Sequence, residues 1–181
     1  MPDYAGAFGD MTLLDDQITT TNTSSVFAPG QIFYWRGGSN RGNTALVKWV
    51  QLDNNGCSQG EALISDLATV TAYGVAKSTT TVGFNRLFRG VSAATIASNS
   101  FGFMIISGYV EKMDFSQTVA SGEMVTMSGS VAGKLTAHFS SSIMNATIGT
   151  VSQSTITEAV AVARVAVATG VGSAHLIGCW G

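Results

Sequence analysis

The sequence predicts an all-β fold, in the form of a small antiparallel barrel or sandwich, and two features of the chain carry this prediction. Short segments rich in β-branched and aromatic residues recur at intervals of about 8 to 12 residues, separated by Gly, Ser or Asn. The chain of 181 residues also contains 21 glycines but 2 prolines, so glycine makes most of the turns. This length accommodates one domain or two small ones.

Residues 1–30 differ from the rest and predict an extended N-terminal arm. Residues 19–27 (TTTNTSSVF) are polar and rich in hydroxyl groups, and Ala28-Pro29-Gly30 is a strong turn signal. Apolar residues before this run are sparse. Two interpretations stay open, a frayed terminus and an arm that docks on a neighbouring subunit.

Strands are predicted from residue 31 onwards. Residues 31–38 (QIFYWRGG) are aromatic and β-branched and end at two glycines, and residues 44–52 (TALVKWVQL) alternate between two faces. Residues 53–56 (DNNG) supply a turn. Residues 60–70 (GEALISDLATV) are interpreted as a strand, although their leucine and valine spacing also fits a short helix.

The second half of the chain predicts one long strand followed by short ones. Residues 101–115 (FGFMIISGYVEKMDF) form a dense apolar run that predicts a well-buried strand. A phase change near Arg164 predicts a bulge or a strand buried on both faces. The shorter predicted strands lie within residues 68–76, 124–131, 133–139, 145–152 and 157–169.

A weak internal repeat suggests two similar β-modules. In the first unit, residues 48–52 lead through a turn into residues 59–63 (QGEAL); in the second, residues 103–106 lead into residues 121–125 (SGEMV). Each unit has an apolar strand, a polar crossover, and then Gly-Glu followed by two apolar residues. The predicted organisation is therefore an arm over 1–30, a first β-module over 31–90, and a second β-module with a C-terminal tail over 91–181.

The composition limits the classes of partner. The chain is 45% hydrophobic and 11% charged, against about 25% charged in typical domains, and its net charge is -2. The 9 Lys and Arg residues are scattered singly, which argues against binding to nucleic acid or to a membrane surface. No secretory signal and no apolar run of about 18 residues is expected. Few charges give weak solubility, so we expect other protein to cover much of the surface.

Residues that support catalysis are not predicted to converge. His138 and His175 have no nearby partner at metal-ligand spacing, and the glycine clusters near residues 37 and 170 lack the pattern of a phosphate loop. We therefore expect no enzyme activity, no metal and no cofactor. Cys57 and Cys179 are expected to stay reduced, although a disulfide between them is not excluded.

Aromatic and apolar residues in three regions, the N-terminal arm, residues 33–35 and the C-terminal tail, are candidates for contact with another subunit or a capsid. Phe33, Tyr34 and Trp35 are consecutive, so in a strand at least one of them points away from the core. Aromatic residues are favoured at interfaces. The full set of predicted contact residues is Tyr4, Phe8, Leu13, Leu14, Phe33, Tyr34, Trp35 and Trp180.

A pattern of turns and strands over about residues 45–168 resembles the head decoration (cement) proteins of tailed bacteriophages and related capsid accessory proteins. It includes an aromatic-Gly-aromatic strand start, a Gly-acid hairpin and an Ile-Gly turn before a later strand. The segments that carry the resemblance are 90–96 (GVSAATI), 101–110 (FGFMIISGYV), 120–125 (ASGEMV), 133–137 (GKLTA) and 148–151 (IGTV), with 59–63 and 73–76 (YGVA) similar to its first half.

This resemblance implies a virion protein on the capsid surface, with the major capsid protein as its partner and a homo-oligomer, most often a trimer, as its form. It implies no catalytic residues and no cofactor. The alternative from the same residues is another virion component, a fibre or knob domain that binds a host receptor glycan through its aromatic side chains. A small hydrolase is the third hypothesis, and it lacks an identifiable nucleophile–base pair.

Overall fold

The structure is a computed structural model, and it describes residues 12–13, 15–36, 44–66, 73–79, 87–137 and 159–177. It contains a single turn of helix, α1 (Asp15–Ile18), together with strands. The strands are β1 (Thr12–Leu13), β2 (Ile32–Arg36), β3 (Thr44–Leu52), β4 (Ala62–Ser65), β5 (Gly74–Lys77), β6 (Phe88–Ser92), β7 (Phe101–Phe115), β8 (Met124–Met127), β9 (Leu135–Ala137), β10 (Ala161–Ala163) and β11 (Gly170–Leu176).

The predicted all-β class is confirmed. The segment 101–115 is one strand along its whole length, and residues 62–65 form a strand and not a helix. The strands of the described residues join into one 11-stranded sheet. Most strand pairs are antiparallel, as expected, but three pairs, β1–β2, β3–β5 and β7–β9, are parallel, so the sheet is mixed.

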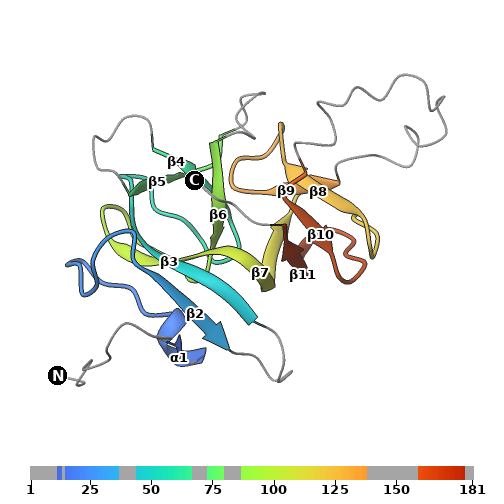
Figure 1. Cartoon of the computed structure of the whole chain (residues 1–181). Coiled ribbons are helices and arrows are strands. Elements are labelled where there is room, and N and C mark those ends of the chain that lie inside the picture. The colour runs from blue at the N-terminus through green and yellow to red at the C-terminus, as the bar shows by residue number, and fades with distance from the viewer. Residues whose placement is uncertain are drawn as a thin grey trace.

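The pairings close the sheet into two rings of strands that share β7. In the first ring β3 pairs with β5, β5 with β4, β4 with β6, β6 with β7, and β7 with β3 again. In the second ring β7 pairs with β11, and β10, β8 and β9 lead back to β7. Figure 1 shows the two rings on either side of β7. The two parallel pairs, β3–β5 and β7–β9, complete the two rings.

Gly108 marks the point on β7 where the neighbouring strands change. Residues 101–108 pair with β3, and residues 108–115 pair with β11. Gly108 has a φ of 92°, which L side chains rarely adopt. A Cβ atom there would overlap the carbonyl oxygen of Thr44 and lie 2.8 Å from Cα of Ala45. Only glycine lets β3 approach β7 this closely where β7 passes from one ring to the other.

The two rings repeat the same backbone hydrogen bonds. The amide of Gly60 donates to Ser92 as that of Gly122 donates to Ala163, and each of Gly60 and Gly122 has a positive φ. Glu61 accepts a 2.7 Å bond from the amide three residues earlier, and Glu123 does the same. The Gly-Glu pairs noted in the sequence therefore occupy equivalent positions. We call two residues counterparts when they make the same pairing in the two rings.

A second pair of contacts repeats between the rings. The isolated bridge between Cys57 and Ile96 has its counterpart in the bridge between Val119 and Val167. In both rings a glycine then makes room for the apolar side chain of the bridge. A Cβ at Gly102 would lie 2.6 Å from Ile96, and one at Gly172 would overlap Val167. Residues 90 and 91, where the sequence predicted the module boundary, lie inside β6 of the first ring; the division into two domains stays a prediction.

Each ring is filled by apolar side chains. The interior of the first ring has its own cluster, which includes Val50, Leu63, Val75 and Met104. A larger cluster packs the other face of β3 and continues through the second ring, with members from Leu13 to Leu176. Four counterparts of first-ring interior residues, Met113, Val125, Leu135 and Ala174, belong to this larger cluster and are 0% exposed.

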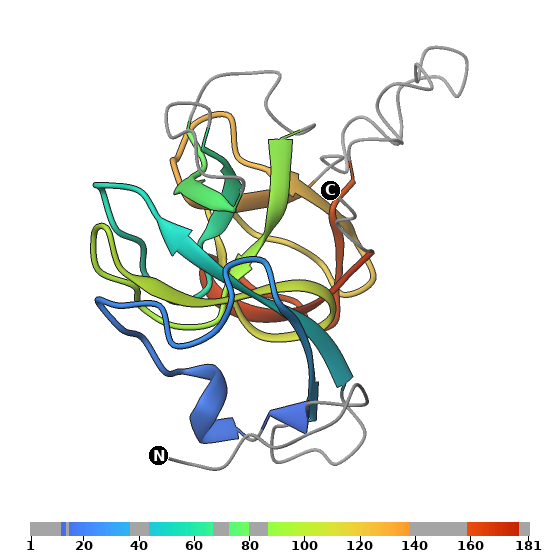
Figure 2. The same cartoon turned by 60° about the vertical axis from the view of Figure 1, so that its left-hand side comes forward.

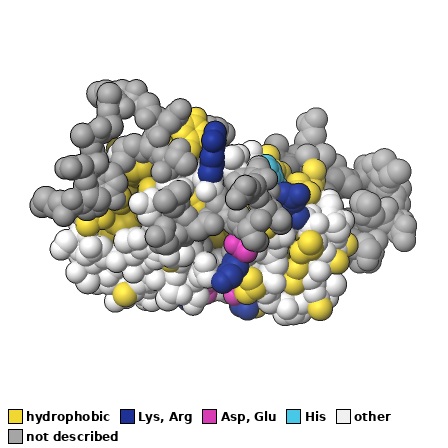
Figure 3. Space-filling view, turned by 90° about the horizontal axis from the view of Figure 1, so that it is seen from below, with side chains coloured by type: hydrophobic (Ala, Val, Ile, Leu, Met, Phe, Trp, Pro, Cys, Tyr) yellow, Lys and Arg dark blue, Asp and Glu magenta, His cyan; other side chains and the backbone are white. Residues whose placement is uncertain are grey.

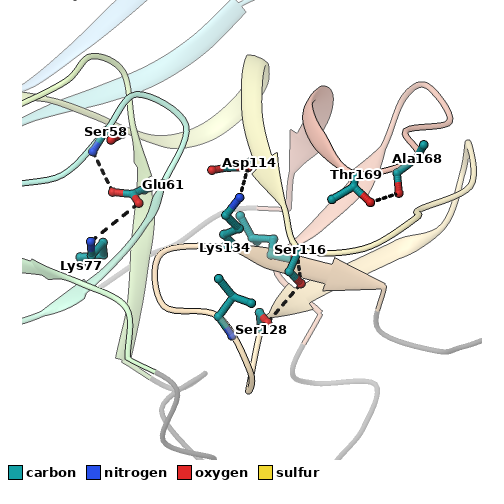
Figure 4. A network of polar contacts seen from close by, with 11 residues as sticks. Ser58, Glu61, Lys77, Asp114, Ser116, Ser128, Lys134, Ala168 and Thr169 are labelled. Carbon is teal, nitrogen blue, oxygen red and sulfur yellow. Dashed lines mark hydrogen bonds and ion pairs between the residues drawn. The ribbon is translucent and has the colours of Figure 1, made fainter.

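Beside β7, each ring contains one ion pair, and a backbone hydrogen bond joins the two rings. Lys77 forms an ion pair with Glu61 (3.8 Å) in the first ring, and Lys134 forms one with Asp114 (3.1 Å) in the second. Figure 4 shows these two pairs near one another. Between the rings, the amide of Ala62 donates to the carbonyl of Gly133 at 2.7 Å. These bonds hold the hairpin before β9 against the first ring.

The described part of the predicted arm packs on the first ring. β1 pairs with β2, and Leu13 and Ile18 are buried. Asn22 bridges to Phe101, and Phe27 lies 5.2 Å from Trp49 between ring centroids. Figure 2 shows α1 and β2 on the same side of the first ring. Leu13 and Ile18 thus belong to the core of this chain, and Phe27 packs against it.

Candidate binding surface at the mouth of the first ring

The structure separates the predicted contact residues into buried and exposed ones. Strand β2 alternates, so Phe33 (1% exposed) and Trp35 (4%) point into the core, whereas Tyr34 is 52% exposed. Leu13 is also buried. The expectation that Leu13, Phe33 and Trp35 contact a partner is corrected, because strand parity places their side chains in the core. The other predicted residues, Tyr4, Phe8, Leu14 and Trp180, lie outside the described residues.

Aromatic stacking explains why Phe33 is buried. Its ring lies 5.5 Å from Phe103 and 5.0 Å from Phe27, both with edge-to-face character. Trp49 joins the same group at 4.7 Å from Phe103. Such pairs are favourable beyond the area that they bury. The cluster fixes β2 on β3 and so decides that Tyr34 points outward.

The outward face of β2 and β3 carries an exposed apolar patch. Ile32 (49% exposed) lies opposite Lys48 in the antiparallel pair, and Tyr34 lies opposite Leu46. Opposite residues of such a pair share a face. Tyr73 (44% exposed) adjoins them, since its ring lies 5.5 Å from Nζ of Lys48. We call Ile32, Tyr34 and Tyr73 the apolar patch. Sequence reasoning identified Tyr34 and missed Ile32 and Tyr73.

A pocket of about 100 Å³ opens beside the apolar patch, at one end of the first ring. Its floor is made of side chains from the ring interior, and its rim carries two cations, Lys48 and Arg89. Nε of Arg89 donates a hydrogen bond to Oγ of Ser65. The lining residues are Lys48, Val50, Ser65, Tyr73, Gly74, Val75, Arg89 and Met104.

The surroundings of the pocket disfavour the charged form of Lys48. Burial lowers the pKa of Lys48, and the positive charge of Arg89 lowers it further. Among the described residues, none that lines the pocket is Asp or Glu. The pocket therefore combines two positive side chains with an apolar floor, and the ammonium of Lys48 lies over the ring of Tyr73.

Surface chemistry elsewhere is consistent with the low charge of the sequence. On the face that Figure 3 shows, the charged side chains lie in a central band, and hydrophobic side chains are spread over the rest among uncharged groups. Within the described ranges, no three or more His, Cys, Asp and Glu residues come together as a metal site. His175 lies exposed on β11, and His138 is outside the described residues. The described helix is too short to cross a membrane.

Cys57 is a buried free thiol inside the first ring. Its Sγ donates to Oγ of Ser92 at 3.2 Å. Burial, as the largest influence, raises the pKa of this thiol. The predicted reduced state thus holds for Cys57, while Cys179 lies outside the described residues.

We predict that Cys57 reacts with iodoacetamide only when the protein unfolds. The native thiol stays protonated at pH values where an unfolded one, with a pKa of about 8.5, ionises. The native state therefore binds more protons than the unfolded state in this pH range. The contribution of the thiol to stability is full below the unfolded pKa and is lost as the pH rises through the folded pKa. Peptide mapping after alkylation, with and without urea, measures labelling at residue 57. Equal labelling of native and unfolded protein would contradict the burial of Cys57.

Comparison with known proteins adds no identification: no protein-family model matches this chain, and no curated protein has a matching sequence.

Proposed function

We propose that this protein is a structural component of a tailed-bacteriophage virion that binds the assembled capsid as a decoration protein. Its partner in this proposal is the major capsid protein, and it acts as a homo-oligomer, with a trimer as the first expectation. Its role is binding and reinforcement, and it uses no cofactor. The observation that carries the proposal is the apolar patch of Ile32, Tyr34 and Tyr73, exposed on a body whose two rings are locked together.

Two further observations support this proposal. Four glycines in the segments that resemble decoration proteins, Gly90, Gly108, Gly122 and Gly133, stand where the backbone has a positive φ. The backbone conformation at these turns therefore requires glycine, which explains the glycines in the turn pattern that carries the resemblance. A shell-reinforcing protein also has to resist deformation, and the continuous β7 strand links both rings covalently and through hydrogen bonds.

A co-sedimentation experiment tests the proposal. The purified chain is mixed with capsids of the phage that encodes it, assembled without this chain. We expect it to sediment with the capsids, and we expect light scattering to show an oligomer. A chain that is a strict monomer and does not bind these capsids would overturn the proposal.

Substitutions test the role of the apolar patch in this binding. We expect Ile32→Ser with Tyr34→Ser to weaken capsid binding by about tenfold or more, because interface residues in a buried centre contribute over 1 kcal/mol each. Val171→Ser is the control, since Val171 is 58% exposed on β11 of the second ring. If the control and the patch variants weaken capsid binding equally, the apolar patch is not the capsid-binding surface.

A glycan-binding fibre or knob domain is the second candidate. The exposed rings of Tyr34 and Tyr73 favour it, because aromatic faces stack on sugar rings. Glycan-array binding that is lost in Tyr34→Ser and Tyr73→Ser, together with a location at a fibre tip in micrographs, would support this function in place of capsid decoration.

A further inference from the structure

One short turn occurs three times among the described residues. Its copies are residues 28–32 (APGQI), 58–62 (SQGEA) and 120–124 (ASGEM), which we call the first, second and third turns. The glycine of each turn has a positive φ, of 87°, 88° and 82° in chain order. In each turn the amide after the glycine donates a hydrogen bond to the carbonyl three residues earlier, at 2.9, 3.3 and 3.2 Å.

Each turn also pairs with a neighbouring strand in the same way. The amide of its glycine donates to one carbonyl of that strand, and the amide of the same strand residue donates back to the residue after the glycine. The strand residues are Trp49 for the first turn, Ser92 for the second and Ala163 for the third. The three turns are therefore copies of one structural unit, as in repeat proteins, whose units bury surface against the next unit.

The first two turns are covered by other segments of this chain. A Cβ at Gly30 would overlap the ring of Tyr73, which directly precedes β5. A Cβ at Gly60 would lie 2.8 Å from the carbonyl oxygen of Lys112 on β7. Both contacts leave no room for a side chain, so the backbone of each turn is itself part of the packing surface.

The second turn is buried by elements of the second ring. The carbonyl of Gly60 accepts a hydrogen bond from the amide of Asp114 on β7 at 3.0 Å. The amide of Ala62 donates to the carbonyl of Gly133, in the hairpin before β9, at 2.7 Å. Ala62 is 0% exposed and Glu61 is 8% exposed. Backbone hydrogen bonds and apolar contact thus bind protein to this kind of turn.

The third turn lacks such a cover among the described residues. A Cβ at Gly122 would meet none of their atoms within 4 Å. Met124, the counterpart of the fully buried last residue of the second turn, is 39% exposed. Val165 is 49% exposed and lies nearby, because Oγ of Ser121 donates to the carbonyl of Arg164 at 3.0 Å. The third turn therefore exposes an apolar surface that the second turn buries.

We propose that the third turn is the site where a second copy of this chain docks. The inference rests on the homo-oligomer of the proposed function and names one of its contact surfaces. A second copy is the occupant that the chain itself suggests, because segments of this same chain cover the two equivalent turns. A terminal repeat that remains in water has a polar outer face, whereas Met124 and Val165 are apolar.

The charges at the third turn favour this occupant over a partner that binds by electrostatic attraction. Glu123 is the charged residue of the turn, and its Oε2 accepts a hydrogen bond from the amide of Ala120 at 2.7 Å. The guanidinium of nearby Arg164 lies over the ring of Tyr109 at 5.4 Å. The apolar patch proposed for the capsid is on the first ring, so the third turn, on the second ring, is a separate surface.

Sedimentation velocity of the full-length chain over a range of concentrations tests this interface. We expect wild type to associate and Met124→Asp to raise the dissociation constant about tenfold or more, because the new carboxylate would lose water inside the interface. Met124→Leu keeps the surface apolar and is expected to associate as wild type does. Val26→Asp is the matched control, since Val26 is 53% exposed in the segment before β2, and it is expected to leave association unchanged.

Three results would overturn the interface. They are a wild type that stays monomeric at all concentrations, a Met124→Asp variant that associates as wild type does, and equal losses in Met124→Asp and Val26→Asp. Because Met124 is exposed, its substitution is expected to leave the urea midpoint of the monomer unchanged. That measurement separates a loss of association from a loss of folding.

Photocrosslinking identifies the occupant directly. The photoreactive amino acid p-benzoylphenylalanine replaces Met124, and isotope-labelled and unlabelled copies are mixed before illumination. We expect crosslinked peptides that join a labelled copy to an unlabelled one. Crosslinks confined to single copies, or crosslinks to the capsid protein alone when capsids are present, would rule out a second copy as the occupant.

Capsid co-sedimentation distinguishes this inference from the proposed function. If wild type is a monomer that sediments with capsids, the interface inference fails and the decoration function stands. If wild type associates through the third turn but does not sediment with capsids, the decoration function fails and the interface between copies stands.

Discussion

Replacing Gly108 by alanine is expected to lower the free energy of unfolding by about 3 kcal/mol or more, as is usual when backbone strain and overpacking occur together. The left-handed φ of 92° disfavours any side chain by about 1–2 kcal/mol. The new Cβ would in addition overlap the carbonyl oxygen of Thr44, and backbone atoms move less easily than side chains. Urea denaturation measures the loss.

Gly122→Ala is the matched control for this prediction. Gly122 has a similar φ of 82°, but a Cβ there would meet no atom within 4 Å. We expect this variant to lose about 1–2 kcal/mol, the cost of the backbone conformation alone. The difference between the two variants measures the close approach of β3 to β7. Equal losses would contradict the role of Gly108 as the point where the two rings meet.

Trp49→Ala is expected to cost about 3–5 kcal/mol of stability, as in other large-to-small core substitutions. Trp49 is fully buried and makes edge-to-face contacts with the rings of Phe103 and Phe27. Its Nε1 also donates to Oγ of Ser25 at 3.0 Å. The substitution therefore removes a core side chain and the anchor of the segment before β2, so we expect faster proteolysis near residues 22–27 as well.

Tyr34→Ala is the control for Trp49→Ala, because Tyr34 is aromatic, lies on the adjacent strand and is 52% exposed. We expect its stability to change by about 0.5 kcal/mol or less, as for other surface substitutions. Urea denaturation gives both values, and limited proteolysis reports on residues 22–27. Similar losses for the two variants, or an unchanged proteolysis pattern in Trp49→Ala, would contradict the packing of this segment on β3.

The sequence predicted the class of the fold and its longest strand, because these depend on local patterns. The apolar run of residues 101–115 is long enough to indicate β7 by itself. The two Gly-Glu turns were also visible, since Gly60 and Gly122 precede the same acid in the same context. The closure of two rings was not predictable, because the parallel pairs β3–β5 and β7–β9 join strands that are not neighbours in the chain.

The binding surface was predicted only in part. Three consecutive aromatic residues require at least one to point outward, but which one depends on the partner strand, and pairing with β3 selects Tyr34. The pocket brings together Lys48, Tyr73 and Arg89 from separate segments, and each of them is an isolated residue in the sequence. The signal present in the sequence is the internal repeat: a residue-by-residue alignment of its two units shows polar residues of one unit where the other has apolar residues.

The most direct test of a capsid-binding role is a cryo-electron microscopy map of the intact phage particle at side-chain resolution. We expect density for this chain on the outer capsid surface, with Tyr34 and Tyr73 against the major capsid protein. Density for the chain in a tail fibre, or a capsid surface on which it is absent, would contradict it.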